Sequence, residues 1–343
     1  MLEFFCMKRH YALDLMRIFL CLCVIAIHSE SYFGITNNYI YTFLFTFLFQ
    51  ANGLFYMISG YFNLDKEFNN STDIIRFYKN AIIKILIPFL AFVLFWTIWE
   101  YVHVTESLNI LELLGIYYRS IMDSSCNTHL WFMYPYFGLL LSTPFLSKMV
   151  HNMNDKELNI LWYVIIGFNI VSLYLCNYFG IGFRMSAMFL DGWYLYYFGG
   201  YYYRRVIAKE NKTKWIILGI IGYVFTVLGK LYLENFNNST DISVLFTLFC
   251  IGCLLFWDKA IKVNNNKIQK IIGFLSRYTF YIYLFHMRAI ELVQHRIITN
   301  TGNVLSNILL VILTFIVSLI AGIVTDFLLK PVQKLIDKAW KVK

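Results

Sequence analysis

The sequence predicts an all-α protein, a polytopic helix bundle that crosses a membrane about ten times with both chain ends in the cytoplasm. Its 343 residues are 59% hydrophobic and only 14% charged, whereas soluble chains carry about 25% charged residues. So few charges cannot cover a water-exposed surface. Apolar runs suited to a membrane core roughly 30 Å thick follow one another along the chain, and basic residues gather in every second loop between them.

We expect a single membrane domain over residues 1–343, with a core at 11–330 and a short basic cytoplasmic tail at 331–343. The first apolar run contains Asp14 and Arg17 and lacks a small-residue cleavage site, so we expect a retained helix and no signal peptide. The candidate spans are roughly 11–30, 40–62, 81–101, 130–147, 158–178, 186–203, 215–233, 242–258, 271–293 and 304–329.

The distribution of basic residues predicts the orientation of these spans. One side carries clusters near residues 8–9, 66–79, 148–156, 204–214, 259–270 and 330–343, whereas the other has few basic residues, such as Arg119, Arg184 and Arg296. Because Lys and Arg in short loops favour the cytoplasm, the clustered side is cytoplasmic. The formal net charge of +9 therefore indicates topology and contact with anionic membrane lipids, and no nucleic-acid partner is expected.

The first span holds three ionisable residues, Asp14, Arg17 and His28. Buried ionisable groups are costly in a membrane, so each is a functional candidate. Asp14 lies one turn before Arg17, at a spacing that suits an ion pair. Arg17 and His28 lie within about 20° of one helix face and about 16 Å apart along the axis. Histidine suits general-base chemistry, and Glu30 can orient His28 only if the helix has ended there.

The second and third spans frame a basic region on the cytoplasmic side. In the segment 55–62, Ser59-Gly60 permits close approach of helices. Arg76 and Lys79 share a helix face and Lys84 follows before Pro88. Together with Arg17 they predict an anion site for the phosphates of a nucleotide-like donor. An ordinary basic juxtamembrane loop explains these residues equally well.

Two more histidines lie at the depth of His28. His129 opens the fourth span beside Trp131, and His286 lies near Tyr283 in the outer half of the ninth span. The three histidines can surround one outer cavity. The alternative is that each satisfies a local backbone carbonyl or marks a helix end.

These segments together resemble the acyltransferase-3 family of bacterial membrane O-acyltransferases. The resemblance extends over about residues 11–330, and the order and spacing of the motifs carry it. The matching features are Asp14, Arg17 and His28, the segment Phe55–Phe62, the basic residues up to Pro88, the segment His129–Trp131 and the segment Tyr281–His286.

The resemblance implies transfer of an acyl group, most often acetyl, from cytoplasmic acetyl-CoA or another acyl-CoA to an envelope glycan, exopolysaccharide or lipid-linked sugar. His28 would be the catalytic histidine, either as base or as transient acyl carrier, with Arg17 and Asp14 supporting it. A pantetheine arm threaded into the bundle would have to bridge the distance from Arg17 to His28.

The same resemblance implies roles for the flanking residues. The phosphates of CoA would bind to Arg76, Lys79 and Lys84. The acceptor side would be lined by Glu30, His129, Trp131, Tyr283 and His286. No metal is expected, because the cysteine pair at 250 and 253 has no second pair to complete a site.

We expect a stand-alone enzyme of the bacterial cytoplasmic membrane, acting alone, as a homodimer or with separate polysaccharide-synthesis proteins. The competing function is an exporter or flippase for a polysaccharide or small molecule, because buried Arg and His also serve proton-coupled transport. The two halves of the sequence show no convincing inverted repeat with broken helices, which is typical of transporters, so the enzyme is favoured.

Overall fold

The computed structural model describes residues 9–104, 109–124, 127–182, 192–233, 242–296 and 304–340. The regular structure within these ranges is entirely helical, which confirms the predicted fold class. Among the described helices, six segments are long and apolar enough to cross a membrane, namely Tyr11–His28, Asn38–Asn63, Ser71–His103, Asp155–Leu175, Lys212–Tyr232 and Val304–Ala339.

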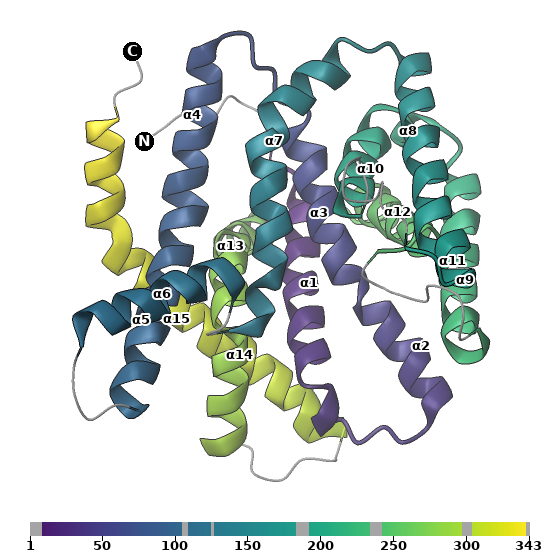
Figure 1. The fold of residues 1–343 in the computed structure, drawn as a ribbon. Coiled ribbons are helices and arrows are strands. Elements are labelled where there is room, and N and C mark those ends of the chain that lie inside the picture. The colour runs from purple at the N-terminus through teal and green to yellow at the C-terminus, as the bar shows by residue number, and fades with distance from the viewer. Residues whose placement is uncertain are drawn as a thin grey trace.

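The helices follow the predicted spans in order and pack as one bundle (Figure 1). They are α1 (Tyr11–His28), α2 (Asn38–Leu48), α3 (Gln50–Asn63), α4 (Ser71–Ala81), α5 (Ile87–Val104), α6 (Ile110–Asp123), α7 (Met133–His151), α8 (Asp155–Ile170), α9 (Cys176–Tyr178), α10 (Trp193–Arg205), α11 (Lys212–Tyr232), α12 (Val244–Lys259), α13 (Asn266–Leu275), α14 (Thr279–Arg296) and α15 (Val304–Ala339). The four other predicted spans fall on α7, α10, α12 and α14, and the span at 186–203 begins outside the described residues. A total of ten crossings and the cytoplasmic location of both ends stay predictions.

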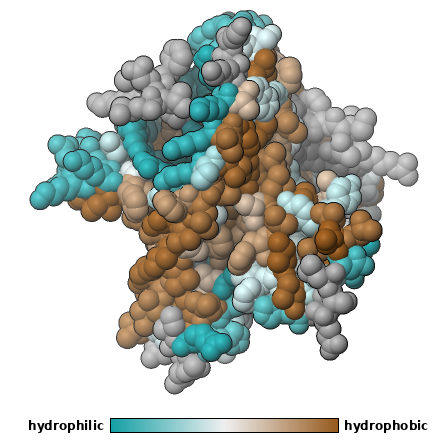
Figure 2. All heavy atoms as spheres, turned by 90° about the vertical axis from the view of Figure 1, so that its left-hand side faces the viewer, coloured by the Kyte–Doolittle hydropathy of each residue, from teal (hydrophilic) through white to brown (hydrophobic). Residues whose placement is uncertain are grey.

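The face formed by α4, α5 and α15 is strongly apolar. Large hydrophobic side chains are exposed there, among them Phe95 and Trp99 on α5 and Ile312, Ile316 and Ile320 on α15. Figure 2 shows this face as a broad hydrophobic area with hydrophilic patches above and below it. An apolar surface of this extent is stable when lipid covers it.

Two glycines allow α3 and α10 to pack backbone against backbone. A Cβ atom on Gly60 would lie 1.8 Å from the carbonyl oxygen of Tyr197, and one on Gly200 would lie 1.9 Å from the carbonyl oxygen of Met57. Any larger side chain at either position would force the helices apart. The prediction of close helix approach at Ser59-Gly60 is therefore confirmed.

The basic helix α4 continues into the bundle through a π-helical segment, Ile82–Leu86, and then becomes α5. Pro88 follows, and its ring nitrogen cannot donate a hydrogen bond to the carbonyl of Lys84 four residues earlier. A π turn accommodates such an interruption without breaking the helix. Lys84 therefore lies on a widened turn where α4 enters the bundle.

Candidate functional site

Three histidines from three parts of the chain meet at the end of α1. The ring centroid of His28 lies 5.0 Å from that of His286, and the ring centroid of His286 lies 4.9 Å from that of His129. His28 is the last residue of α1 and is exposed, whereas His129 and His286 are 4% and 0% exposed. The histidines expected at similar depth are thus brought together.

Backbone carbonyls of α14 fix the two buried imidazoles. Nε2 of His129 lies 3.2 Å from the carbonyl oxygen of Leu284, and Nδ1 of His286 lies 2.6 Å from that of Tyr283. A carbonyl oxygen can only accept, so these nitrogens carry the protons and the other nitrogen of each neutral ring is an acceptor. The Tyr283 hydroxyl donates to the carbonyl of His129 at 2.6 Å. His129 and His286 therefore satisfy local carbonyls and also belong to the cluster.

Glu30 lies next to this cluster on a separate turn. α1 ends at His28, and a 3₁₀ turn begins at Glu30, so the condition for Glu30 to act on His28 is met. The carboxylate accepts a hydrogen bond of 2.6 Å from the Tyr41 hydroxyl and acts on His28 through its charge. A carboxylate at this position can stabilise positive charge that develops on the imidazole of His28.

An aromatic surface flanks His129. Trp131 is 37% exposed, and its ring lies 5.6 Å from that of Trp193. Trp193 in turn stacks on Tyr56 at 4.6 Å. Rings of this kind present large apolar faces with a polar edge, and such faces suit packing against the carbon skeleton of a sugar.

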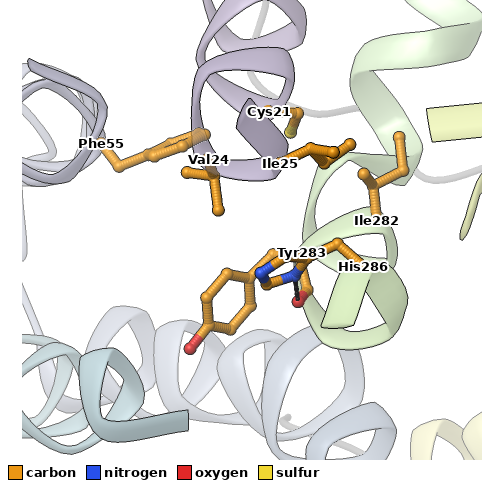
Figure 3. A pocket seen from close by; sticks show the side chains of 7 residues that line it. All are labelled: Cys21, Val24, Ile25, Phe55, Ile282, Tyr283 and His286. Carbon is orange, nitrogen blue, oxygen red and sulfur yellow. Dashed lines mark hydrogen bonds between the residues drawn. The ribbon is translucent and has the colours of Figure 1, made fainter. Parts of the chain in front are cut away.

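A narrow cavity lies along α1, between the histidines and Arg17. About 190 Å³ of space lies between the side chains that line it, and this space is partly open to solvent. Cys21, Val24 and Ile25 occupy the part of α1 between Arg17 and His28, so the cavity follows the helix face that joins these two residues, which we call the stripe. Figure 3 shows the side chains that line it, which are Cys21, Val24 and Ile25 of α1, Phe55 of α3, and Ile282, Tyr283 and His286 of α14.

Asp14 forms an ion pair with Arg17 near the start of α1. Its Oδ1 lies 3.3 Å from Nη1 of Arg17, and its Oδ2 lies 2.6 Å from Nε of Arg9. Arg9 also donates, over 2.9 Å, to the carbonyl of Gly273 and to the hydroxyl of Ser276. Asp14 therefore connects α1 to the end of α13 and positions Arg17, and it lies a helix length away from His28.

Lys66 is a further cation near Arg17 and Lys84. The sequence predicts it only as a basic residue of a cytoplasmic loop. Its ammonium donates to the side-chain oxygen of Asn63 at 2.6 Å. Burial, reinforced by repulsion from Lys84 and Arg17, lowers the pKa of Lys66 to about 8. Lys84 and Arg17 therefore lie near enough for their charges to act on Lys66, and a group of cations of this kind suits binding of a polyanion. The turn that follows α3 brings Lys66 back toward α1, and residue spacing does not predict such a turn.

The other two predicted phosphate ligands have acidic partners on or near α4. Nη1 of Arg76 lies 3.7 Å from Oδ1 of Asp73, and the Arg76 side chain is 55% exposed. Nζ of Lys79 lies 2.8 Å from Oδ1 of Asp337, near the end of α15. Of the three predicted basic residues, Lys84 is therefore the one placed beside Lys66.

Sequence reasoning missed an ion pair that lies near His129. Arg288 of α14 pairs with Glu100 of α5 and, at 3.2 Å, with Glu291. Its guanidinium also lies 4.6 Å above the ring of Trp96, and its charge acts on His129. The cost of burying charges in a predicted span, which selected Arg17, is the signal that would have found Arg288 and Glu100.

Comparison with known proteins supports the resemblance derived from the motifs. The chain matches the acyltransferase-3 family, described as an acyltransferase domain, over residues 10–325. A search of curated proteins and a search of solved structures gave no match. The family match extends from the start of α1 into α15 and includes the apolar helices long enough to cross a membrane. The chain therefore belongs to the acyltransferase-3 family of membrane acyltransferases.

Proposed function

We propose that the protein is an O-acyltransferase, most specifically an O-acetyltransferase, of the bacterial cytoplasmic membrane. It takes the acyl group from cytoplasmic acetyl-CoA and transfers it to a hydroxyl of an envelope glycan, exopolysaccharide or lipid-linked sugar. One observation carries this proposal. A cationic site around Arg17, an apolar cavity and the exposed His28 follow one another along a single face of α1.

The distance from Arg17 to His28 matches the length of the pantetheine arm of CoA. Thirteen bonds join the sulfur of CoA to the nearest phosphorus, and an extended chain of that length spans about 15 Å. Arg17 and His28 lie about 16 Å apart along α1. With its phosphates at Arg17, Lys66 and Lys84, the donor would present its thioester level with His28. The apolar walls between them, such as Val24 and Ile25, suit the methyl and methylene groups of the arm.

Acetyl-CoA supplies an acyl group activated as a thioester. His28 takes the proton of the acceptor hydroxyl while that oxygen attacks the carbonyl carbon of the thioester. The carbon–sulfur bond then breaks, and the imidazolium of His28 returns the proton to the departing sulfur. Glu30 favours the charged imidazole during this step. Arg17 and Lys66 bind the donor phosphates, and Trp131 packs against the acceptor sugar.

The test is transfer of labelled acetyl from acetyl-CoA to a crude envelope-glycan fraction by purified protein in lipid nanodiscs. We expect His28→Ala to bind CoA as the wild type does and to transfer at least about 100-fold more slowly. His295→Ala is the matched control, because His295 is exposed near the outer end of α14, and it should transfer at the wild-type rate.

Two results would contradict the proposal. Transfer by His28→Ala at the wild-type rate would remove His28 from the chemistry. If the wild type neither binds CoA nor transfers label, while cells lacking the gene fail to export a glycan, the exporter would replace the enzyme.

A further inference from the structure

His286 has one polar atom that the proposed mechanism does not use. Its side chain is 0% exposed, and Nδ1 donates to the carbonyl of Tyr283 at 2.6 Å. Nε2 is consequently an acceptor with a free lone pair. Across the described part of the chain, no residue donates a hydrogen bond to Nε2. A buried acceptor without a partner costs free energy, so this atom indicates a missing ligand.

The cavity beside α1 determines what that ligand can be. Figure 3 shows the imidazole of His286 projecting from α14 into the space beside Val24 and Ile25. The other walls, including Phe55 and Ile282, are apolar. A water molecule there would find few of the two to four polar partners that it needs. A thin, mostly apolar chain that carries an N–H group suits the cavity better.

We propose that His286 binds the acyl donor: its Nε2 accepts a hydrogen bond from the pantetheine amide N–H nearest the sulfur. This inference rests on the proposed function, and it moves His286 from the acceptor side, where the family resemblance placed it, to the donor side. His286 is then a donor-positioning residue for the transfer that His28 catalyses.

The geometry of the arm agrees with this assignment. Three bonds separate the amide nitrogen from the sulfur, so the two atoms lie within about 4 Å of each other. The rings of His286 and His28 are separated by 5.0 Å. An amide held at His286 therefore places the thioester beside His28. His129 packs edge-on against His286 at 4.9 Å and holds the imidazole in this orientation.

The test compares two variants and two donor probes in nanodiscs. His286→Leu removes the acceptor, whereas His286→Gln carries an amide oxygen near the position of Nε2. The probes are CoA and a CoA analogue methylated on the amide nitrogen nearest the sulfur. Calorimetry gives the affinity of each protein for each probe, and steady-state kinetics gives the KM for the glycan acceptor.

We expect His286→Leu to bind CoA about tenfold more weakly with an unchanged KM for the acceptor, and His286→Gln to recover most of the affinity. The wild type should bind the methylated analogue about tenfold more weakly than CoA. His286→Leu should bind both probes equally, because the hydrogen bond is already lost.

The outcomes separate this inference from the proposed function. If His286→Leu raises the KM for the acceptor and leaves CoA affinity unchanged, His286 belongs to the acceptor side and the inference is overturned while the enzyme stands. Equal affinity of the wild type for both probes also overturns it, and this comparison decides the matter if the variants fail to fold. If the wild type binds no CoA, the proposed function fails first.

Discussion

The ammonium of Lys79 lies 2.8 Å from a carboxylate oxygen of Asp337, so the end of α15 contacts the basic helix α4. A second hydrogen bond of 3.0 Å joins the same ammonium to the backbone carbonyl of Asp337. Lys79 is one of the residues expected to bind CoA phosphates. The carboxylate of Asp337 therefore already binds Lys79, which is one of the predicted phosphate ligands.

Replacing Asp337 should strengthen donor binding. In Asp337→Asn, Lys79 loses its competing carboxylate and becomes available as a further phosphate ligand besides Arg17, Lys66 and Lys84. The affinity for CoA should then rise about two- to fivefold, the range of a partly exposed ion pair. Calorimetry in nanodiscs at low salt measures the change. Asp337→Glu keeps the charge and serves as control. Unchanged or weaker binding by Asp337→Asn would mean that Lys79 does not contact the donor.

CoA affinity should depend on pH through Lys66. Burial lowers the pKa of this lysine from its ordinary value of 10.5 to about 8. The protonated ammonium attracts phosphate, and it is lost as the pH rises above 8, so affinity should fall between pH 8 and pH 9.5. Lys66→Arg stays charged over this range and should show a flat profile. A falling profile in that variant would assign the titration to another group.

The same shift affects the stability of the free protein. The folded state releases the Lys66 proton near pH 8, whereas the unfolded chain keeps it up to about 10.5. The cost of burying the charge is therefore present below pH 8 and is relieved as the pH rises toward 10.5. Lys66→Met, which never carries the charge, should remove this contribution, as thermal unfolding of both proteins at pH 7.5 and pH 9.5 would reveal.

Filling the cavity should separate binding of the phosphates from binding of the arm. Val24 lines the cavity and is nearly buried, so the larger ring of Val24→Phe would occupy the path of pantetheine. We expect this variant to bind adenosine 3′,5′-bisphosphate like the wild type, to lose most of its affinity for CoA and to transfer no acetyl. Val224→Phe is the matched control, because Val224 is exposed on α11. Wild-type CoA affinity in Val24→Phe would place the arm elsewhere.

The close approach of α3 and α10 should tolerate no Cβ atom. Gly60→Ala would place one 1.8 Å from the carbonyl oxygen of Tyr197, and the helices would have to separate at a cost of about 3 kcal/mol or more. A lower melting temperature and a lower yield of monodisperse protein would record this. Gly138→Ala on α7 is the control, since nothing lies within 4 Å of its Cβ position.

The sequence determined the helical fold class, the order of the apolar segments and the stripe that joins Arg17 to His28. These features depend on composition and on the period of a single helix, which neighbouring residues define locally. The sequence also predicted that His129 and His286 could bond to backbone carbonyls, because buried polar groups need hydrogen-bond partners. The structure shows these two bonds.

Only the tertiary structure decided which distant residues meet. It placed Lys66 beside Lys84 and Arg17, Asp337 beside Lys79, and the buried Nε2 of His286 at a cavity along α1. Helix periodicity says which face of a helix is polar, but the partner of that face depends on how helices pack through small residues such as Gly60. That packing is a property of the whole bundle, so no local pattern in the chain specifies it.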